Sequence, residues 1–104
     1  MITPMIYHLI SEAAWNKQIH ERVLKVPSLE VEGFIHCCTQ QQIEGVLSRY
    51  FKGQTDLLVL AIDEHKLEAE LRLEKSTNDE LFPHVYGAIN KGAILSVNRV
   101  GKQN

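Results

Sequence analysis

The sequence predicts an α+β fold in one domain that spans residues 1–104. Short apolar or alternating runs, typical of strands, recur along the chain, whereas only two helical patterns are found, both in the first half. A chain of 104 residues with 44% hydrophobic and 23% charged residues suits one hydrophobic core. No Gly-x-Gly-x-x-Gly sequence is present, which disfavours a doubly wound dinucleotide-binding fold.

The first elements predicted are two strands separated by a short helix. In an extended run over residues 5–10, His8 shares a face with two isoleucines. Ser11 is placed to cap a short helix whose apolar stripe consists of Ala14, Trp15 and Ile19. A second strand over residues 34–38 follows Gly33 and places on one face Phe34, His36 and Cys38.

The main helix is predicted over about residues 40–51. Thr39 and Gln42 fit a capping box, and Gly53 is a suitable stop. The apolar residues at helical spacing are Ile43, Val46, Leu47, Tyr50 and Phe51. Residues 57–62 are apolar on both faces, which favours a strand at the centre of a sheet, and a turn follows over 63–66.

The last third of the chain predicts a hairpin and a final strand. The alternation over residues 70–74 directs Leu71 and Leu73 to the core and leaves Glu74 at the rim. After a polar loop over 75–80, Pro83 keeps the chain extended into residues 84–87. With a last strand over 93–100, five or six short strands and two helices are expected.

Charge and hydropathy exclude several functional classes. Eleven basic and thirteen acidic residues give a net charge of -2 without a block of one sign, so no nucleic-acid partner is expected. No apolar run is long enough for a signal peptide or a membrane span, so we expect a cytoplasmic protein without a membrane partner. The only cysteines, Cys37 and Cys38, are adjacent, and reduced thiols are expected.

Three histidines in or beside predicted strands, His8, His36 and His84, are the first candidates for chemistry. A structural histidine with one nitrogen on a main-chain acceptor explains each of them taken alone. A zinc site built from His36, Cys38 and a further histidine is an alternative, although the usual ligand spacings are missing. A cysteine in an apolar strand is more often a small hydrophobe than a nucleophile. Glu74 is either a solvated rim residue or a catalytic carboxylate.

Several segments together resemble a known family. They are Tyr7-His8, Glu32-Gly33-Phe34-Ile35-His36-Cys37, Gln42, Leu58-Val59-Leu60-Ala61-Ile62-Asp63 and Leu81-Phe82-Pro83-His84-Val85-Tyr86-Gly87. With them, nearly the whole chain, from about Ile6 to Val100, resembles the DUF952 family of small bacterial proteins. The family's fold is similar to that of ADP-ribosyltransferases and RNA 2'-phosphotransferases. The resemblance therefore implies a split, curved sheet with a cleft that in these relatives holds NAD or a similar nucleotide.

The resemblance also implies roles for individual residues. His8 looks like the histidine that orients a ribose, and His84 and Glu74 are the other catalytic candidates, Glu74 by its position along the chain only. The ligand-binding candidates are His36, Tyr86, Thr39, Gln42 and Cys38. Of these, Thr39 and Gln42 open a helix whose main-chain amides are suited to a pyrophosphate, and Tyr86 is suited to stack on a planar ring.

Two departures from the family pattern restrict the contacts and the chemistry that the resemblance implies. Position 38 is commonly serine in the family and is Cys38 here, which replaces a hydroxyl with a weaker hydrogen-bonding thiol. No arginine lies in the signature segments, which disfavours RNA 2'-phosphate transfer.

The function expected from the sequence is binding of a small molecule, a nucleotide or NAD as substrate, with ADP-ribosyl or glycosyl transfer as the chemistry. The alternative is a non-enzymatic module that binds a small molecule or a partner in the same cleft. No resident cofactor or metal is required, and protein partners and oligomeric state stay open.

Overall fold

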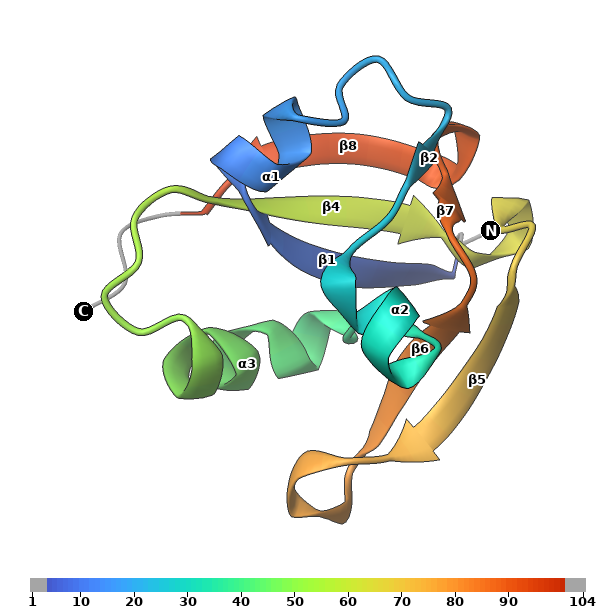
Figure 1. The fold of residues 1–104 in the computed structure, drawn as a ribbon. Helices are drawn as coiled ribbons and strands as arrows, with labels where there is room; N and C mark the ends of the chain where they lie inside the picture. The colour runs from blue at the N-terminus through green and yellow to red at the C-terminus, as the bar shows by residue number, and fades with distance from the viewer. Residues whose placement is uncertain (1–3, 101–104) are drawn as a thin grey trace.

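The fold consists of three small antiparallel sheets and three short helices in the computed structural model, which describes residues 4–100 (Figure 1). The first sheet has the order β1-β4-β8, with bounds Met5–Ser11, Leu57–Asp63 and Ile94–Arg99. The second has the order β3-β6-β5, with bounds Ile35–His36, Leu81–Tyr86 and Glu70–Lys75. The pair β2-β7, Val23–Leu24 and Ile89–Asn90, forms the third.

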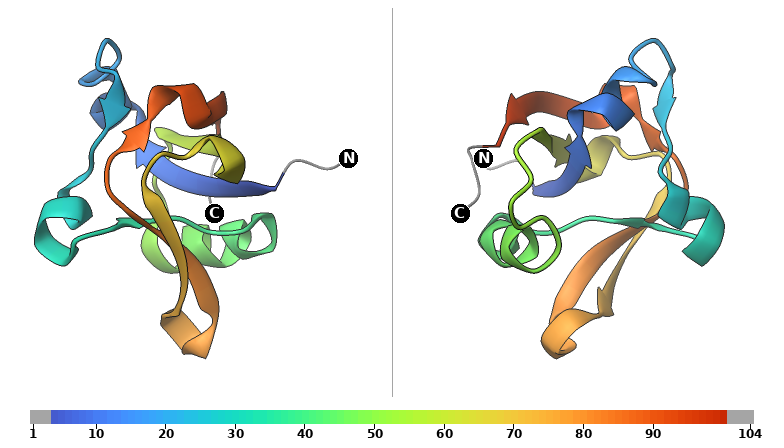
Figure 2. Two further views of the ribbon diagram at one scale, coloured as in Figure 1. Left: turned by 90° about the vertical axis from the view of Figure 1, so that its right-hand side faces the viewer. Right: turned by 60° about the vertical axis from the view of Figure 1, so that its left-hand side comes forward.

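The helices are α1 (Glu12–Asn16), α2 (Pro27–Glu32) and α3 (Ile43–Tyr50). Four single 3-10 turns occur in the described chain, of which η1 (Gln40–Gln42) leads directly into α3 and η3 (Thr77–Asp79) connects β5 to β6. The two three-stranded sheets diverge, so the β5-β6 hairpin projects away from the β1-β4-β8 sheet (Figures 1 and 2). Helix α3 lies beneath the β1-β4-β8 sheet, beside the hairpin.

The predicted central strand is confirmed. Strand β4 pairs with β1 along one edge and with β8 along the other, and each of its faces packs into a hydrophobic cluster. One face, with Leu60 and Ile62, joins the larger core together with residues of α1, β2, β3, β6 and β7. The other face carries Leu57 against Leu47 of α3 and closes a smaller core. The helix predicted over 40–51 is also present, with its first turn in the 3-10 form.

Other expectations need correction. The described chain holds eight strands and three α-helices, instead of five or six strands and two helices. The unpredicted strands β2 and β7 are only two residues long, and the strand predicted over 34–38 is reduced to β3, which has two residues. Helix α2 was not predicted, although it begins with Pro27 and ends at Gly33, whose φ of 91° is a left-handed conformation that suits glycine. Ile19 lies beyond α1 and is exposed, and Leu73 is 63% exposed and does not enter the core.

Candidate functional site

The site begins where the two three-stranded sheets separate. Tyr7 of β1 and Cys38 exchange two main-chain hydrogen bonds of 2.8 Å, which join the sheets at this pair. In an antiparallel ladder the next hydrogen-bonded pair would be Leu9 with His36. That pair is not formed, because the main-chain carbonyl of His36 accepts a hydrogen bond of 2.6 Å from Nδ1 of His8 instead. The side chain of His8 thus stands where the ladder stops.

The edge of β1 is consequently open at Leu9. Because Tyr7 uses its main-chain groups on this edge, alternation directs the N–H and C=O of Leu9 to the same edge, away from β4. Outside the strand ladders, neither group makes a main-chain hydrogen bond with a described residue. The open edge offers one donor and one acceptor side by side.

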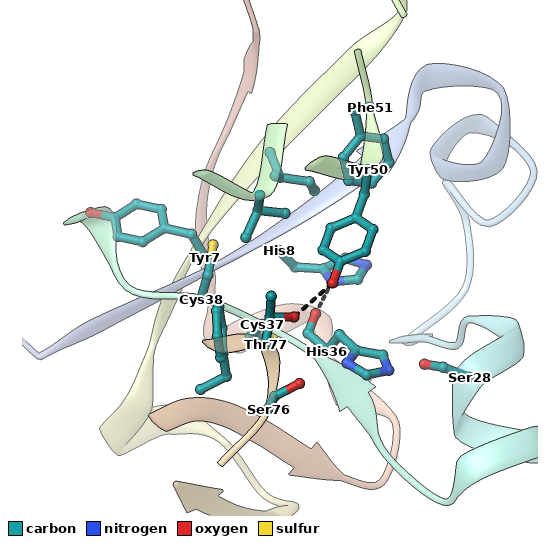
Figure 3. A pocket seen from close by; sticks show the side chains of 13 residues that line it. Tyr7, His8, Ser28, His36, Cys37, Cys38, Tyr50, Phe51, Ser76 and Thr77 are labelled. Carbon is teal, nitrogen blue, oxygen red and sulfur yellow. Dashed lines mark hydrogen bonds between the residues drawn. The ribbon is translucent and has the colours of Figure 1, made fainter. Parts of the chain in front are cut away.

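Two adjoining hollows follow this edge, with volumes of about 380 and 360 Å³. They share His8, Leu9, Ser28 and Phe51, and we call them together the groove. Figure 3 shows the side chains around the first hollow, where Tyr50 of α3 and Thr77 of η3 share a hydrogen bond of 2.7 Å. The other lining residues of the first hollow are Tyr7, His36, Cys37, Cys38, Val46, Ser76 and Phe82. Those of the second are Ile10, Ser11, Ala14, Val26, Pro27 and Gln54.

The hydrogen bond to a carbonyl fixes the tautomer of His8. A carbonyl oxygen only accepts, so Nδ1 of His8 carries a proton. Burial lowers the pKa of His8 below its ordinary 6.5, against the raising effect of the carbonyl, and the nearby His36 lowers it further. The ring is therefore neutral near pH 7, and Nε2 holds a lone pair. Nε2 has no hydrogen-bond partner among residues 4–100 and is not sealed from solvent, so it serves as an acceptor in the groove.

The lowered pKa of His8 makes stability depend on pH. Below about pH 6.5 the unfolded chain binds a proton that folded His8 resists, so the free energy of unfolding should decrease as the pH falls. The decrease should approach about 1.4 kcal/mol per pH unit until the folded-state pKa is reached. Urea denaturation between pH 7.5 and 5 would measure it. His8→Gln should lose this slope, while the exposed-histidine control His20→Gln should keep it. Equal slopes in both variants would contradict the assignment.

The two cysteines are protonated at neutral pH. Burial raises the pKa of the Cys37 thiol strongly, and it raises the pKa of Cys38 to about 11. Cys38 lines the groove, and a thiol with such a pKa is a small apolar group and a poor nucleophile.

A second polar cluster lies on the β5-β6 hairpin, beside the groove. Oε1 of Glu74 accepts hydrogen bonds from Nδ1 of His84 at 2.8 Å and from the hydroxyl of Tyr86 at 2.6 Å. These two donors, Tyr86 first, hold the pKa of Glu74 below its usual value, so the carboxylate stays charged. Both donors bind the same oxygen, and Oε2 bonds to no described residue. Glu74 faces Phe82 across the hairpin, and Phe82 lines the groove.

Aromatic rings cover His84. Its ring stacks on Phe34 at 4.1 Å between centroids, and the ring of His36 lies edge-on at 5.3 Å. His84 is buried, and its Nε2 is the one buried side-chain nitrogen or oxygen without a partner in the described part of the chain. His84 therefore positions Glu74 and does not face the groove.

The structure divides the predicted site residues into three sets. His8, His36 and Cys38 line the groove, whereas His84, Glu74 and Tyr86 form the neighbouring hydrogen-bonded cluster. The ring of His36 also donates to Glu32 at 2.8 Å.

The third set, Thr39 and Gln42, lies outside both hollows. The N–H of Thr39 donates to Oε1 of Gln42 at 3.0 Å, and the side-chain amide of Gln42 donates to the carbonyl of Leu81 at 2.9 Å. They are thus engaged as a capping box and as a link between η1 and β6. No group of three or more His, Cys, Asp or Glu side chains suited to a metal is present in residues 4–100.

Sequence reasoning missed several residues that line the groove. Tyr50 was assigned to the apolar stripe of the helix but is 61% exposed, and Thr77 was assigned to a loop. Leu9 was read as one more apolar residue of its strand, although its role in the site comes from its main chain. Only the pairing of β1 with Cys38 reveals that edge, and no local signal in the sequence carries it.

Comparison with known proteins identifies relatives of this fold. The family model described as "Protein of unknown function (DUF952)" matches residues 9–97. The crystal structure of protein CC0527 from Caulobacter crescentus superposes with a TM-score of 0.84 at 25% identity, covering 92% of this chain and 85% of that one. Its solution NMR structure gives a TM-score of 0.80 at 24% identity, covering 93% and 84%. No curated protein matches the chain. No helix within residues 4–100 is long and apolar enough to cross a membrane.

Proposed function

We propose that this chain, which belongs to the DUF952 family, binds a small planar molecule of the nucleoside type in the groove along β1. The observation that carries this proposal is the open edge of β1, where the free main-chain groups of Leu9 lie beside the acceptor nitrogen of His8. A nucleobase or a carboxamide-bearing ring presents a donor and an acceptor along one edge, which complements the N–H and C=O of Leu9.

The lining of the groove suits a ring. Tyr50, Phe51 and Phe82 supply flat apolar surface, and aromatic rings of ligands pack well against such side chains. The volume of the first hollow, about 380 Å³, lies toward the small end of ligand sites. Main-chain groups, aromatic walls and one oriented histidine are a usual composition for a pocket that binds a small molecule.

The separation of the sheets supports the family-level expectation for the fold. Two antiparallel sheets that are joined at the Tyr7–Cys38 pair and diverge from it are consistent with the split, curved sheet that the resemblance implies. We assign the chain to that type as part of this proposal.

Glycosyl transfer is a second candidate, favoured by the free Oε2 of Glu74. In such a reaction the bond between C1' of a ribose and the ring nitrogen breaks, and the ring leaves with the electron pair. A hydroxyl oxygen of water or of an acceptor forms the new bond at C1' and releases its proton to solvent. For a ribose that extends from the groove toward the β5-β6 hairpin, the charged Glu74 would stabilise the positive charge that develops at C1'. His84 and Tyr86 are positioning residues in this scheme.

Binding without turnover is favoured by the protonation states. Cys37 and Cys38 are held as thiols, and the bond to Glu74 raises the pKa of Tyr86, so none of the three is an activated nucleophile. Transfer at this site would therefore need direct attack by water or an acceptor hydroxyl, whereas binding alone needs no such group.

Thermal unfolding with adenosine, nicotinamide, ADP-ribose and NAD tests the proposal. A ligand at about a hundred times its Kd stabilises by roughly 2.7 kcal/mol, which should raise the Tm by on the order of ten degrees. The shift should vanish in His8→Ala and persist in the exposed control His20→Ala. No shift with any of the four at millimolar concentration would overturn the nucleoside assignment. Release of nicotinamide from NAD on long incubation would favour transfer over binding alone.

A further inference from the structure

The described lining of the groove is poor in charge. Among the described residues that line its two hollows there is no lysine, arginine, aspartate or glutamate. Burial lowers the pKa of His8 and raises those of Cys37 and Cys38, so these three side chains are neutral at pH 7. His36, which also lines the first hollow, is paired with Glu32. The guanidinium of Arg49 lies over the ring of Tyr50 at 5.8 Å but does not line the groove.

A pyrophosphate does not fit such a lining. Phosphate groups are bound by Arg, Lys or the amides of a helix N-terminus. The helix end predicted for this purpose, at Thr39 and Gln42, lies outside the groove and is occupied by its own capping interactions. Glu32, bonded to His36, places a negative charge near the first hollow. An anion entering the groove would lose much of its hydration without gaining a cationic partner.

We propose that the groove selects uncharged ligands that donate a hydrogen bond, so that its ligand is a nucleoside, a free base or a comparable neutral ring, and not NAD or another phosphorylated nucleotide. This inference rests on the proposed function and specifies its ligand class. Charge selection follows from the neutral lining. The need for a donor follows from His8, whose Nε2 accepts but does not donate.

Three ring compounds of similar size test the charge selection and the donor requirement separately. Benzamide is neutral and donates through its amide, N,N-dimethylbenzamide is neutral without a donor, and benzoate is charged without a donor. Each would be titrated into the full-length, ¹⁵N-labelled protein while the amide signal of Leu9 and the ring nitrogens of His8 are followed by NMR. Benzamide should shift these signals saturably. The dimethyl compound should bind at least about tenfold more weakly, because an acceptor left without a partner costs about 1.4 kcal/mol. Benzoate should cause no shift.

A variant that is expected to gain benzoate binding provides a positive result to set beside the absence of benzoate binding in the wild type. Ser76 is exposed at the rim of the first hollow, and its side chain makes no hydrogen bond to another described residue. Ser76→Arg would supply the missing cation, and benzoate should then shift the signals of Leu9. Benzoate binding to the wild type as tightly as benzamide would overturn the inference while leaving the groove as a ligand site. Equal binding of both amides would overturn the donor requirement. No shift with any compound would instead overturn the proposed function.

Discussion

Replacing Leu60 with alanine is expected to lower the free energy of unfolding by about 2–5 kcal/mol. Leu60 is fully buried at the centre of β4, and its neighbours in the core include Ile6 and Ile62. The strands on both sides fix the main chain around it, so the surroundings cannot collapse into the space left by the side chain. The loss therefore contains a cavity contribution in addition to the lost burial.

The matched control for Leu60 lies directly across the sheet. Val97 is its register partner in β8, but Val97 is 39% exposed. Val97→Ala should cost at most about 1 kcal/mol, since the change removes two methyl groups from a side chain that is already partly in water. Chemical denaturation of both variants gives the comparison, and the Tm of the Leu60 variant should fall by roughly ten degrees or more. Equal losses would mean that β4 is not the central strand.

Replacing Glu74 with alanine is expected to lower the free energy of unfolding by about 1–3 kcal/mol. Glu74 is the acceptor for His84 and Tyr86, and His84 is 4% exposed. Without the carboxylate, Nδ1 of His84 loses its partner in a place that water barely reaches, while Nε2 already has none in the described chain. An unpaired buried donor costs more than the hydrogen bond itself contributes.

The control for Glu74 is Glu70, four residues earlier on the same face of β5. Glu70 makes an exposed ion pair with Arg72 at 2.8 Å, so Glu70→Ala should leave stability nearly unchanged. The two variants also differ in a titration. The hydrogen bond to Glu74 is the main cause of the raised pKa of Tyr86, so that pKa should fall in Glu74→Ala. An unchanged Tyr86 titration in Glu74→Ala would show that the cluster does not form in solution.

These two tests probe different requirements of the groove. The β1-β4-β8 sheet holds the edge on which Leu9 and His8 are presented, whereas the Glu74 cluster orders the hairpin that carries Phe82 to the opposite wall. A Glu74 variant that folds and still binds the small rings would restrict the cluster to positioning or to transfer chemistry.

The sequence alone was sufficient wherever the signal is local. The residues of β4, which are apolar on both faces, predicted its central place in the sheet. The capping box and the helical spacing predicted the helical segment formed by η1 and α3. Alternation along β1 predicted that His8 lies inward. The hydroxyl of Ser11 accepts the N–H of Ala14 at 3.1 Å, as its position before a helix predicted. In each case the information lies within about ten residues, the range over which hydrogen bonds and side-chain periodicity act.

Only the tertiary structure decided how these elements form a site. Tyr50, apolar by spacing, stands at the groove because α3 meets the hairpin turn at Thr77. Glu74 and His84 are ten residues apart, and their bond depends on the register of β5 with β6. The free edge at Leu9 exists because His8 takes the carbonyl of His36, 28 residues away. Such contacts are set by the packing of whole sheets against one another, which leaves no periodic trace in the chain.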